Sequence, residues 1–229
     1  MEQVEFFAPA SGNYLVKVKG YDVPSGPQEF FLVHWFEPEE FVLTYPIGGE
    51  SMVPFSTEKI RWDSYSDTGD VFIQYSSDGG STWFVISAST PASQGYYDWT
   101  VPNIATGNVQ LRITYAGQVS TSNDFSIIRT PSNLQIEYSC PDSIGLSWNT
   151  AANATGYEVY RLGNKYMDSI GVSSINEFVD YTANPLSDKL WYSVASTGPN
   201  DAIGKRLVAV KMQPGIFNCP IAHDAGIEN

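Results

Sequence analysis

Basic residues are scarce in this chain, and long apolar runs are missing from it. The sequence has 12 Lys and Arg against 25 Asp and Glu, which gives a formal net charge of −13 at pH 7. Nucleic-acid binding needs a basic surface, so this balance argues against it. No apolar run is long enough to cross a membrane as a helix. We therefore expect neither a nucleic-acid partner nor a transmembrane segment.

Histidine is also rare, which limits the catalytic chemistry that these residues can support. His34 is predicted to lie at a strand end and His223 in the C-terminal tail, and no Gly-x-Ser-x-Gly motif accompanies them. Because the two histidines fall in different structural units, a serine-protease triad cannot be assembled from them. We expect no catalytic residue within this sequence.

The only two cysteines, Cys140 and Cys219, bracket one predicted domain. They could be free core thiols, but their position outside the predicted strands favours a disulfide that ties the exit of the domain to its start. Such a bond would close a loop of roughly 80 residues and stabilise the fold by at most about 4–5 kcal/mol. The charge balance is compatible with a secreted or cell-surface protein, which is the location we expect, and the disulfide is favoured because such bonds persist in oxidising compartments. The first residues lack the basic and apolar regions of a signal peptide, which favours a piece of a longer precursor.

Short β-rich runs recur about every 8–12 residues, separated by Gly, Pro, Asn, Asp and Ser, and no helical period persists. This pattern predicts an all-β chain made of tandem β-sandwiches. We divide it into residues 1–37, the last strands of a truncated β-sandwich; 38–130 and 131–214, two complete sandwiches; and 215–229, a linker to an absent downstream region.

Two strands are predicted in the first segment, Tyr14–Lys19 and Glu29–Val33. They cannot bury a core by themselves and must pair with further strands or pack on the next domain. The segments Ala8–Val18 and Gly26–Phe30 resemble the closing hairpin of the β-sandwich behind the catalytic domain of bacterial subtilisin-like serine proteases. The resemblance implies an accessory region whose protease triad lies upstream of Met1.

The second segment shows alternating apolar residues typical of strands. They are Ile60 and Trp62; Val71, Ile73 and Tyr75; Trp83 and Val85; Leu111, Ile113 and Tyr115; and Phe125 and Ile127. Four segments, Leu43–Glu50, Ile60–Trp62, Tyr75–Trp83 and Trp99–Pro102, resemble an immunoglobulin-like module that is common in secreted bacterial multidomain proteins.

The third segment resembles a fibronectin type III domain over its full length. Seven strands fit it: Asn133–Tyr138, Ser143–Asn149, Gly156–Gly163, Lys165–Ile170, Asn176–Tyr181, Lys189–Ser196 and Lys205–Met212. The resemblance rests on Leu146–Trp148, Gly156–Arg161 and Trp191–Val194, and it implies that Trp148 is the core tryptophan between the sheets.

One motif matches a known pattern, the Asp-box of sialidase propellers. It consists of Ser76, Asp78, Gly80, Thr82 and Trp83. Propellers carry several copies, one per blade, and this chain has one. We therefore predict a structural hairpin turn, in which the aspartate binds turn amides and glycine takes a positive φ.

Three acidic residues in one loop, Asp63, Asp67 and Asp70, could offer oxygen ligands to calcium. Tyr65 and Gly69 break the alternating ligand pattern of an EF-hand, however, and no glutamate stands at the twelfth position. A solvated acidic hairpin is the preferred interpretation. We expect no cofactor, with calcium as the alternative.

Exposed aromatic side chains could stack on sugars, and the candidates are Trp35, Tyr96 and Tyr97. The competing interpretation buries Trp35 at the joint with the next domain. The leading functional hypothesis is a non-catalytic, monomeric spacer that presents other domains of the same polypeptide. The alternative is an adhesin module that binds a surface protein or polysaccharide, and a third hypothesis is self-association through open sheet edges.

Overall fold

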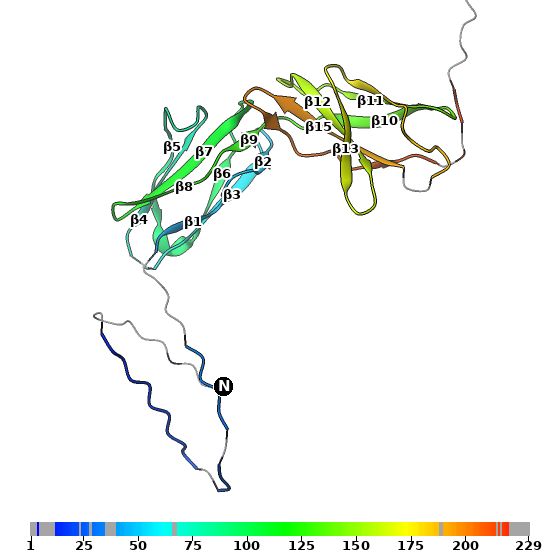
Figure 1. Cartoon of the computed structure of the whole chain (residues 1–229). Helices are drawn as coiled ribbons and strands as arrows, with labels where there is room; N and C mark the ends of the chain where they lie inside the picture. Colours follow the sequence, from blue (N-terminus) through cyan, green and yellow to red (C-terminus); the bar gives the residue numbers. More distant parts are fainter. Residues whose placement is uncertain are drawn as a thin grey trace, which may run out of the picture. The chain divides into compact units, whose positions relative to one another are not determined.

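The computed structural model describes residues 4, 12–22, 24–27, 29–34, 40–65, 68–187, 190–213, 215 and 217–219. The chain divides into two compact units, Met1–Glu37 and Pro38–Asn229. Among the described residues the one helical element is the short 3-10 turn η1 (Ala92–Gln94), and all other elements are strands. The predicted all-β fold is therefore confirmed (Figure 1).

The first unit corrects the sequence-based expectation. No described residue between 12 and 34 belongs to a strand, so the predicted strands Tyr14–Lys19 and Glu29–Val33 do not form there. Their large side chains are exposed, 92% for Leu15 and 94% for Phe31. Alternating apolar residues indicate a preference for strands, but a strand forms only where a neighbouring backbone and a buried face complete it.

The second unit begins with a sandwich of two sheets. One sheet has the order β1-β3-β6; the other has the order β2-β9-β7-β4-β5, with β8 pairing with β7. The strands are β1 (Val42–Tyr45), β2 (Ser51–Met52), β3 (Thr57–Asp63), β4 (Asp70–Ser76), β5 (Phe84–Pro91), β6 (Tyr96–Thr100), β7 (Thr106–Tyr115), β8 (Gln118–Thr121) and β9 (Phe125–Ile127).

A tight turn carries the chain from one sheet of this sandwich to the other, between β1 and β2. The Glu50 carboxylate accepts hydrogen bonds of 2.8 Å from the amides of Ile47 and Gly48. Gly48 has a φ of +125°, and a Cβ atom there would lie 2.5 Å from the Cβ of Asn123. Glycine is therefore required at this position. The switch places β2 parallel to β9, while β1 pairs antiparallel with β3.

The core of this sandwich follows the alternation seen in the sequence. Ile60, Ile73 and Leu111 have no exposed area, and they belong to one buried cluster with Trp62 and Trp99. Each such side chain contributes about 1.5–3 kcal/mol when it leaves water. The indole Nε1 of Trp62 donates to the carbonyl of Ala92 at 2.9 Å, so its burial leaves no unpaired donor.

A second sandwich follows. Its smaller sheet has the order β10-β11-β14, and its larger sheet has the order β13-β12-β15-β16, with β17 pairing with β15. The strands are β10 (Ser132–Ser139), β11 (Ile144–Asn149), β12 (Gly156–Leu162), β13 (Met167–Ser173), β14 (Glu177–Asp180), β15 (Trp191–Gly198), β16 (Ala202–Ile203) and β17 (Val210–Lys211).

Trp148 lies in the core of this sandwich, 2% exposed, where the fibronectin-like pattern places it. Its ring meets Tyr157 edge-on, with ring centroids 5.2 Å apart, an arrangement that aromatic pairs prefer. The predicted last strand, Lys205–Met212, is interrupted. Residues between β16 and β17 still follow β15, because Leu207 N donates to Val194 O at 2.9 Å.

Four residues separate the end of β9 from the start of β10, and the predicted boundary at 130 falls among them. The sequence predicts two separate domains at this point. The structure groups both sandwiches in a single compact unit, because residues on each side of the boundary contact one another.

Candidate functional site

The structure describes two of the three predicted metal ligands, Asp63 and Asp70. Asp63 and Asp70 are both exposed, and Asp70 accepts a hydrogen bond from Ser89 Oγ, whereas Asp67 lies outside the described residues. Within the described part of the chain no group of three or more His, Cys, Asp and Glu side chains could hold a metal ion. Calcium binding therefore stays a prediction.

Two of the three predicted sugar-stacking residues, Tyr96 and Tyr97, lie on different faces of one strand. Tyr96 and Tyr97 are neighbours in β6, where successive side chains point to opposite faces of the sheet. Tyr97 packs against the core, while Tyr96 is 40% exposed with Lys59 Nζ 4.2 Å from its ring centre. Because successive side chains of a strand alternate between its faces, the sequence alone could have shown that adjacent tyrosines do not form one sugar-stacking surface. Trp35 lies outside the described residues.

The structure describes one of the two histidines. His34 is exposed, and His223 lies outside the described residues. No helix of the described chain is long and apolar enough to cross a membrane.

The Asp-box motif forms a closed hairpin turn between β4 and β5. Asp78 Oδ1 accepts from the amide of Thr82 at 2.8 Å and from Ser76 Oγ at 2.7 Å, and its Oδ2 accepts from Thr82 Oγ1 at 2.6 Å. Gly80, with a φ of +88°, donates its amide to Ser76 Oγ at 2.8 Å. Trp83 Nε1 donates to the carbonyl of Gly80 at 2.9 Å. The motif's polar groups are used within the turn itself, in keeping with a structural role.

These bonds stabilise the ionised carboxylate. The hydroxyl and the amide of Thr82, followed by the hydroxyl of Ser76, lower the pKa of Asp78 to about 2. The Arg112 guanidinium lies 4.0 Å above the ring of Trp83, and its Nε donates to Gln74 Oε1 at 2.9 Å. The turn is thus fastened to β7.

A disulfide joins Cys140 and Cys219, whose Cα atoms are 5.1 Å apart. Asn218 adds two bonds to the same place: its amide donates to Ser139 O at 3.0 Å, and its side-chain oxygen accepts from Ser139 N at 2.8 Å. The segment that leaves the second sandwich is therefore tied to the end of its first strand. Residues 220–229 of the predicted linker lie outside the described residues.

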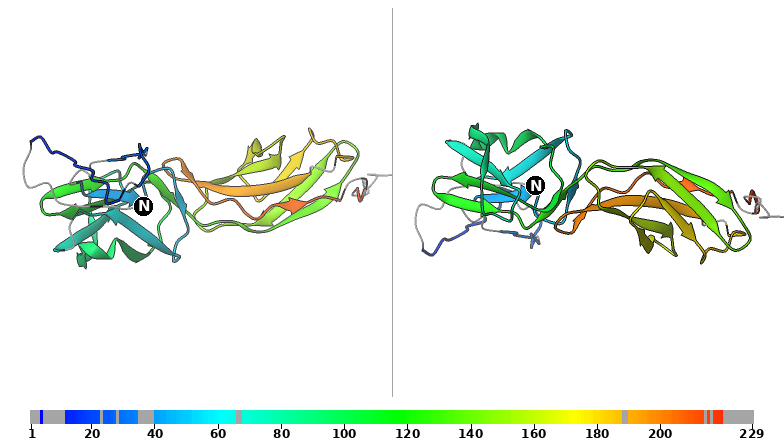
Figure 2. Two further views of the ribbon diagram at one scale, coloured as in Figure 1. Left: turned by 90° about the horizontal axis from the view of Figure 1, so that it is seen from below. Right: turned by 90° about the horizontal axis from the view of Figure 1, so that it is seen from above.

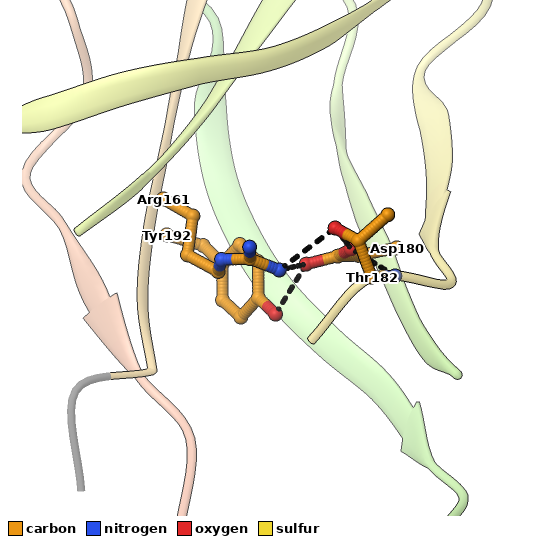
Figure 3. A network of polar contacts seen from close by, with 4 residues as sticks. All are labelled: Arg161, Asp180, Thr182 and Tyr192. Atoms are coloured by element: carbon orange, nitrogen blue, oxygen red, sulfur yellow. Dashed lines mark hydrogen bonds and ion pairs between the residues drawn. The ribbon is translucent and has the colours of Figure 1, made fainter. Parts of the chain in front are cut away.

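Among its described residues, the second sandwich also contains one buried carboxylate, Asp180, which is 2% exposed (Figure 3). It accepts from Tyr192 Oη at 2.9 Å and from the amide and hydroxyl of Thr182, both at 2.8 Å, and it pairs with Arg161. Burial raises the pKa of Asp180, but the Thr182 and Tyr192 bonds and the Arg161 charge outweigh it, so the pKa is lowered overall. This network joins β12, β14 and β15 and is structural.

Direct contacts join the two sandwiches in addition to the connecting segment. In the turn after β15, Asn200 Nδ2 donates to Thr106 Oγ1 at 2.8 Å, and Pro199 O accepts from the amide of Gly107 at 3.1 Å. Gly107 allows this approach, since a Cβ atom there would lie 2.0 Å from the carbonyl oxygen of Asn200. The contact is formed by backbone atoms and by the short side chains of Asn200 and Thr106. Such groups lose little side-chain conformational entropy when they are held together.

Further bonds surround this contact. Ser196 Oγ donates to Arg129 O at 2.6 Å, and the amide of Ile203 donates to Ser126 Oγ at 3.1 Å. Lys205 Nζ pairs with Glu58 Oε1 at 2.8 Å. Because the Lys205 side chain is 49% exposed, we regard the ion pair as weak and the hydrogen bonds as the main support of the contact.

Ile128, in the segment between β9 and β10, has no exposed area. Its methyl groups lie over Gly198 and Gly204, where an added Cβ atom would come within 2.5 Å and 3.2 Å of Ile128 carbons. The two glycines thus form a recess that receives the isoleucine. Figure 2 shows the orange segment after β15 reaching the first sandwich beside this connection.

We call the contacts of Gly107, Ile128 and Asn200 between the two sandwiches the joint. A groove of about 710 Å³ opens beside it. It is lined by residues of both sandwiches, including Tyr45, Glu50, Tyr160, Lys205 and Arg206. Arg206 lies 5.1 Å from the ring centre of Tyr160. Burial, followed by the bond to the carboxylate of Glu158, raises the pKa of Tyr160 to about 12, so its hydroxyl stays protonated at neutral pH.

A second groove, of about 580 Å³, lies over the sheet β10-β11-β14. Its lining is largely polar: Asn133, Gln135, Glu137, Tyr138, Ser147, Asn149, Asn176 and Glu177 contribute to it. Sequence reasoning missed this groove and the joint. Their residues come from distant strands, and the one available signal was the turn-forming Pro199-Asn200-Asp201 after β15.

No protein-family model matches the chain, and a search of curated proteins finds no match. Among solved structures, it is similar to a two-domain fibronectin type III segment from chicken tenascin, at 12% identity and a TM-score of 0.40; the match covers 76% of this chain and 99% of that one. It is also similar to the fibronectin(III)-like modules of Clostridium thermocellum CbhA, at 16% identity and a TM-score of 0.30, covering 75% and 92%.

A cytokine receptor complex is a third similar structure, at 10% identity and a TM-score of 0.43, covering 72% of this chain and 94% of that one. With TM-scores below 0.5, none of these likenesses carries an argument about this chain. The description as two β-sandwiches rests on the sheet orders and buried cores. The association with a subtilisin-like protease finds no support in these likenesses and stays a prediction.

Proposed function

We propose that this chain is a non-catalytic spacer that holds neighbouring parts of a secreted or cell-surface polypeptide in a fixed orientation. The observation that carries the proposal is the joint between the sandwiches. Domains connected within a chain move relative to one another unless their interface opposes it. Here the Gly107–Pro199 and Asn200–Thr106 bonds and the buried Ile128 oppose such motion.

The cysteine pair supports an extracellular location, because disulfides persist in oxidising compartments. The resemblance of Ala8–Val18 and Gly26–Phe30 to subtilisin-like proteases supports a parent polypeptide with such a catalytic domain, which the spacer would position. Adhesion through Tyr96 and Tyr97 is not part of the proposal, since these side chains lie on opposite faces of β6.

The test is ¹⁵N relaxation of the full chain in solution. A spacer with a fixed joint predicts one common rotational correlation time for the amides of both sandwiches. The variant Asn200→Ala removes a joint contact and should give the two sandwiches shorter and unequal times, while Asn149→Ala, on an exposed residue of β11, should not. Unequal correlation times in the unmodified chain would contradict the proposal.

A further inference from the structure

The groove over β10, β11 and β14 lies on the face of the sheet that points away from the core. In β11, Ile144, Leu146 and Trp148 belong to the core cluster, so the alternate residues Gly145, Ser147 and Asn149 face outward. The paired residues on β10 and β14 present further polar side chains beside them, including Gln135 and Glu177, which both lie opposite Ser147.

The aromatic ring of Tyr138 lines one end of this groove. Its ring lies on Gly145, because a Cβ atom there would come within 2.2 Å of Tyr138 Cε1. Glycine is required at position 145, because any Cβ atom there would overlap the Tyr138 ring. Tyr138 remains half-buried and lines the groove, so part of its ring is accessible from outside.

Several polar side chains of the groove are ordered by hydrogen bonds within the protein. Ser147 Oγ donates to Glu137 Oε1, and Gln135 Nε2 donates to Asn133 Oδ1 at 3.0 Å. Asn176 Nδ2 donates to the backbone carbonyl of Trp148 at 2.8 Å. Side chains that are already ordered lose less conformational entropy on binding, which favours a ligand that needs several directed hydrogen bonds.

We propose that this groove binds a neutral oligosaccharide. A pyranose ring has an apolar C–H face that can rest on the ring of Tyr138, and its hydroxyls can donate to Glu137 and Glu177 and bond the amide of Gln135. The groove volume of about 580 Å³ falls within the range of roughly 300–1,000 Å³ that is typical of small-ligand sites. The proposal adds a ligand to the spacer and does not depend on the joint.

Charge selects among the ligands that could fill the groove. The described residues that line it include the carboxylates of Glu137 and Glu177 and no Lys or Arg. Phosphates, sulfated sugars and uronic acids would meet two negative charges with no cation beside them, so they are disfavoured. Hydroxyl groups, in contrast, are good donors to carboxylates, which act only as acceptors.

The experiment is an NMR titration of the full chain with four soluble probes: cellohexaose, xylohexaose, maltohexaose and mannohexaose. We expect at least one probe to shift the amides of β10, β11 and β14, with a Kd on the order of 1 mM or tighter. Tyr138→Ala should weaken that binding about tenfold or more, equivalent to about 1.4 kcal/mol. Tyr166→Ala, which removes a tyrosine that is 76% exposed outside the groove lining, should leave it unchanged.

Glu177→Ala provides a second variant, since Glu177 is exposed and its loss should leave the fold intact. It should weaken binding several-fold with the spectrum otherwise preserved, which decides the question even if Tyr138→Ala unfolds. The proposal is overturned if none of the four probes shifts these amides at concentrations of about 10 mM. It is also overturned if a probe binds with equal strength to the unmodified chain and to Glu177→Ala.

Discussion

Asn200 Nδ2 donates a hydrogen bond of 2.8 Å to Thr106 Oγ1, although 94 residues separate the two in the chain. The bond fastens a turn of the second sandwich to the first residue of β7 in the first. Together with the neighbouring hydrogen bond between Gly107 and Pro199, it restricts the orientation of one sandwich relative to the other. Four predictions follow from this joint and from the contacts that stabilise each sandwich.

The first concerns Gly107. In Gly107→Val the new Cβ atom would meet the carbonyl oxygen of Asn200 at 2.0 Å, and a backbone atom cannot be displaced as a flexible side chain can. We expect the Pro199–Asn200 turn to leave the first sandwich and the free energy of unfolding to fall by about 1–3 kcal/mol. Urea denaturation and ¹⁵N relaxation measure both effects. Gly12→Ala is the control, because a Cβ atom at Gly12 meets no atom of the described residues within 4 Å. Unchanged stability and tumbling in Gly107→Val would show that the joint is not closely packed.

The second concerns the buried carboxylate of Asp180. Asp180→Ala leaves Arg161 without its counter-charge and the buried hydroxyl of Tyr192 without its acceptor. Because the Arg161 side chain is 23% exposed and can reach water, we expect a loss of about 3 kcal/mol, the lower end for breaking a buried pair. Chemical denaturation measures it, with the exposed Asp142→Ala as control. A loss equal to that of the control would mean that the network is not stabilising.

The third concerns acid stability. The pKa of Asp78 is lowered from 3.8 to about 2 in the folded chain, and that of Asp180 is also lowered. Between these values the unfolded chain binds more protons than the folded chain, so the free energy of unfolding decreases as the pH falls. The stabilisation is complete above about pH 4 and is lost as the pH falls through the folded pKa values. We expect Asp78→Asn and Asp180→Asn each to reduce this pH dependence in denaturation curves recorded from pH 5 to about pH 2. A slope identical to that of the unmodified chain in both variants would contradict the assignment.

The fourth concerns the disulfide between Cys140 and Cys219, which are 79 residues apart in the chain. Reduction should lower the stability of the second sandwich by up to about 4–5 kcal/mol, because the unfolded chain gains the conformations that the closed loop denies it. Thermal unfolding with and without a reductant measures the loss. In the double variant Cys140→Ala and Cys219→Ala the reductant should have no effect. If it destabilises both proteins equally, the effect does not come from this bond.

The sandwich architecture could be predicted because it depends on local patterns. Alternation at Val71, Ile73, Leu111 and Ile113 places those side chains on one face of each strand, and all four are fully buried. The Asp78 turn was likewise predictable, since every bond that closes it lies within a few residues.

The remaining features depend on residues that meet only in the folded chain. The alternation of Tyr14–Lys19 resembles that of the buried strands, but nothing in the local sequence tells whether a neighbouring strand is available. Two contacts could be predicted only if the neighbouring strands were already known. They are the hydrogen bond between Asn200 and Thr106 and the packing of the Tyr138 ring against Gly145. The arrangement of Tyr96 and Tyr97, in contrast, could be predicted from the sequence, because adjacent residues of a strand point to opposite faces of the sheet.

The most direct test of the spacer is the set of residual dipolar couplings of the full chain in a weakly aligning medium. Couplings from the described amides of residues 40–128 and of residues 131–213 each define an alignment tensor. The account predicts that both sandwiches report the same tensor, with their orientation set by the contacts at Gly107, Ile128 and Asn200. Two tensors of different magnitude would mean that the sandwiches move independently, and the proposal of a fixed spacer would be wrong.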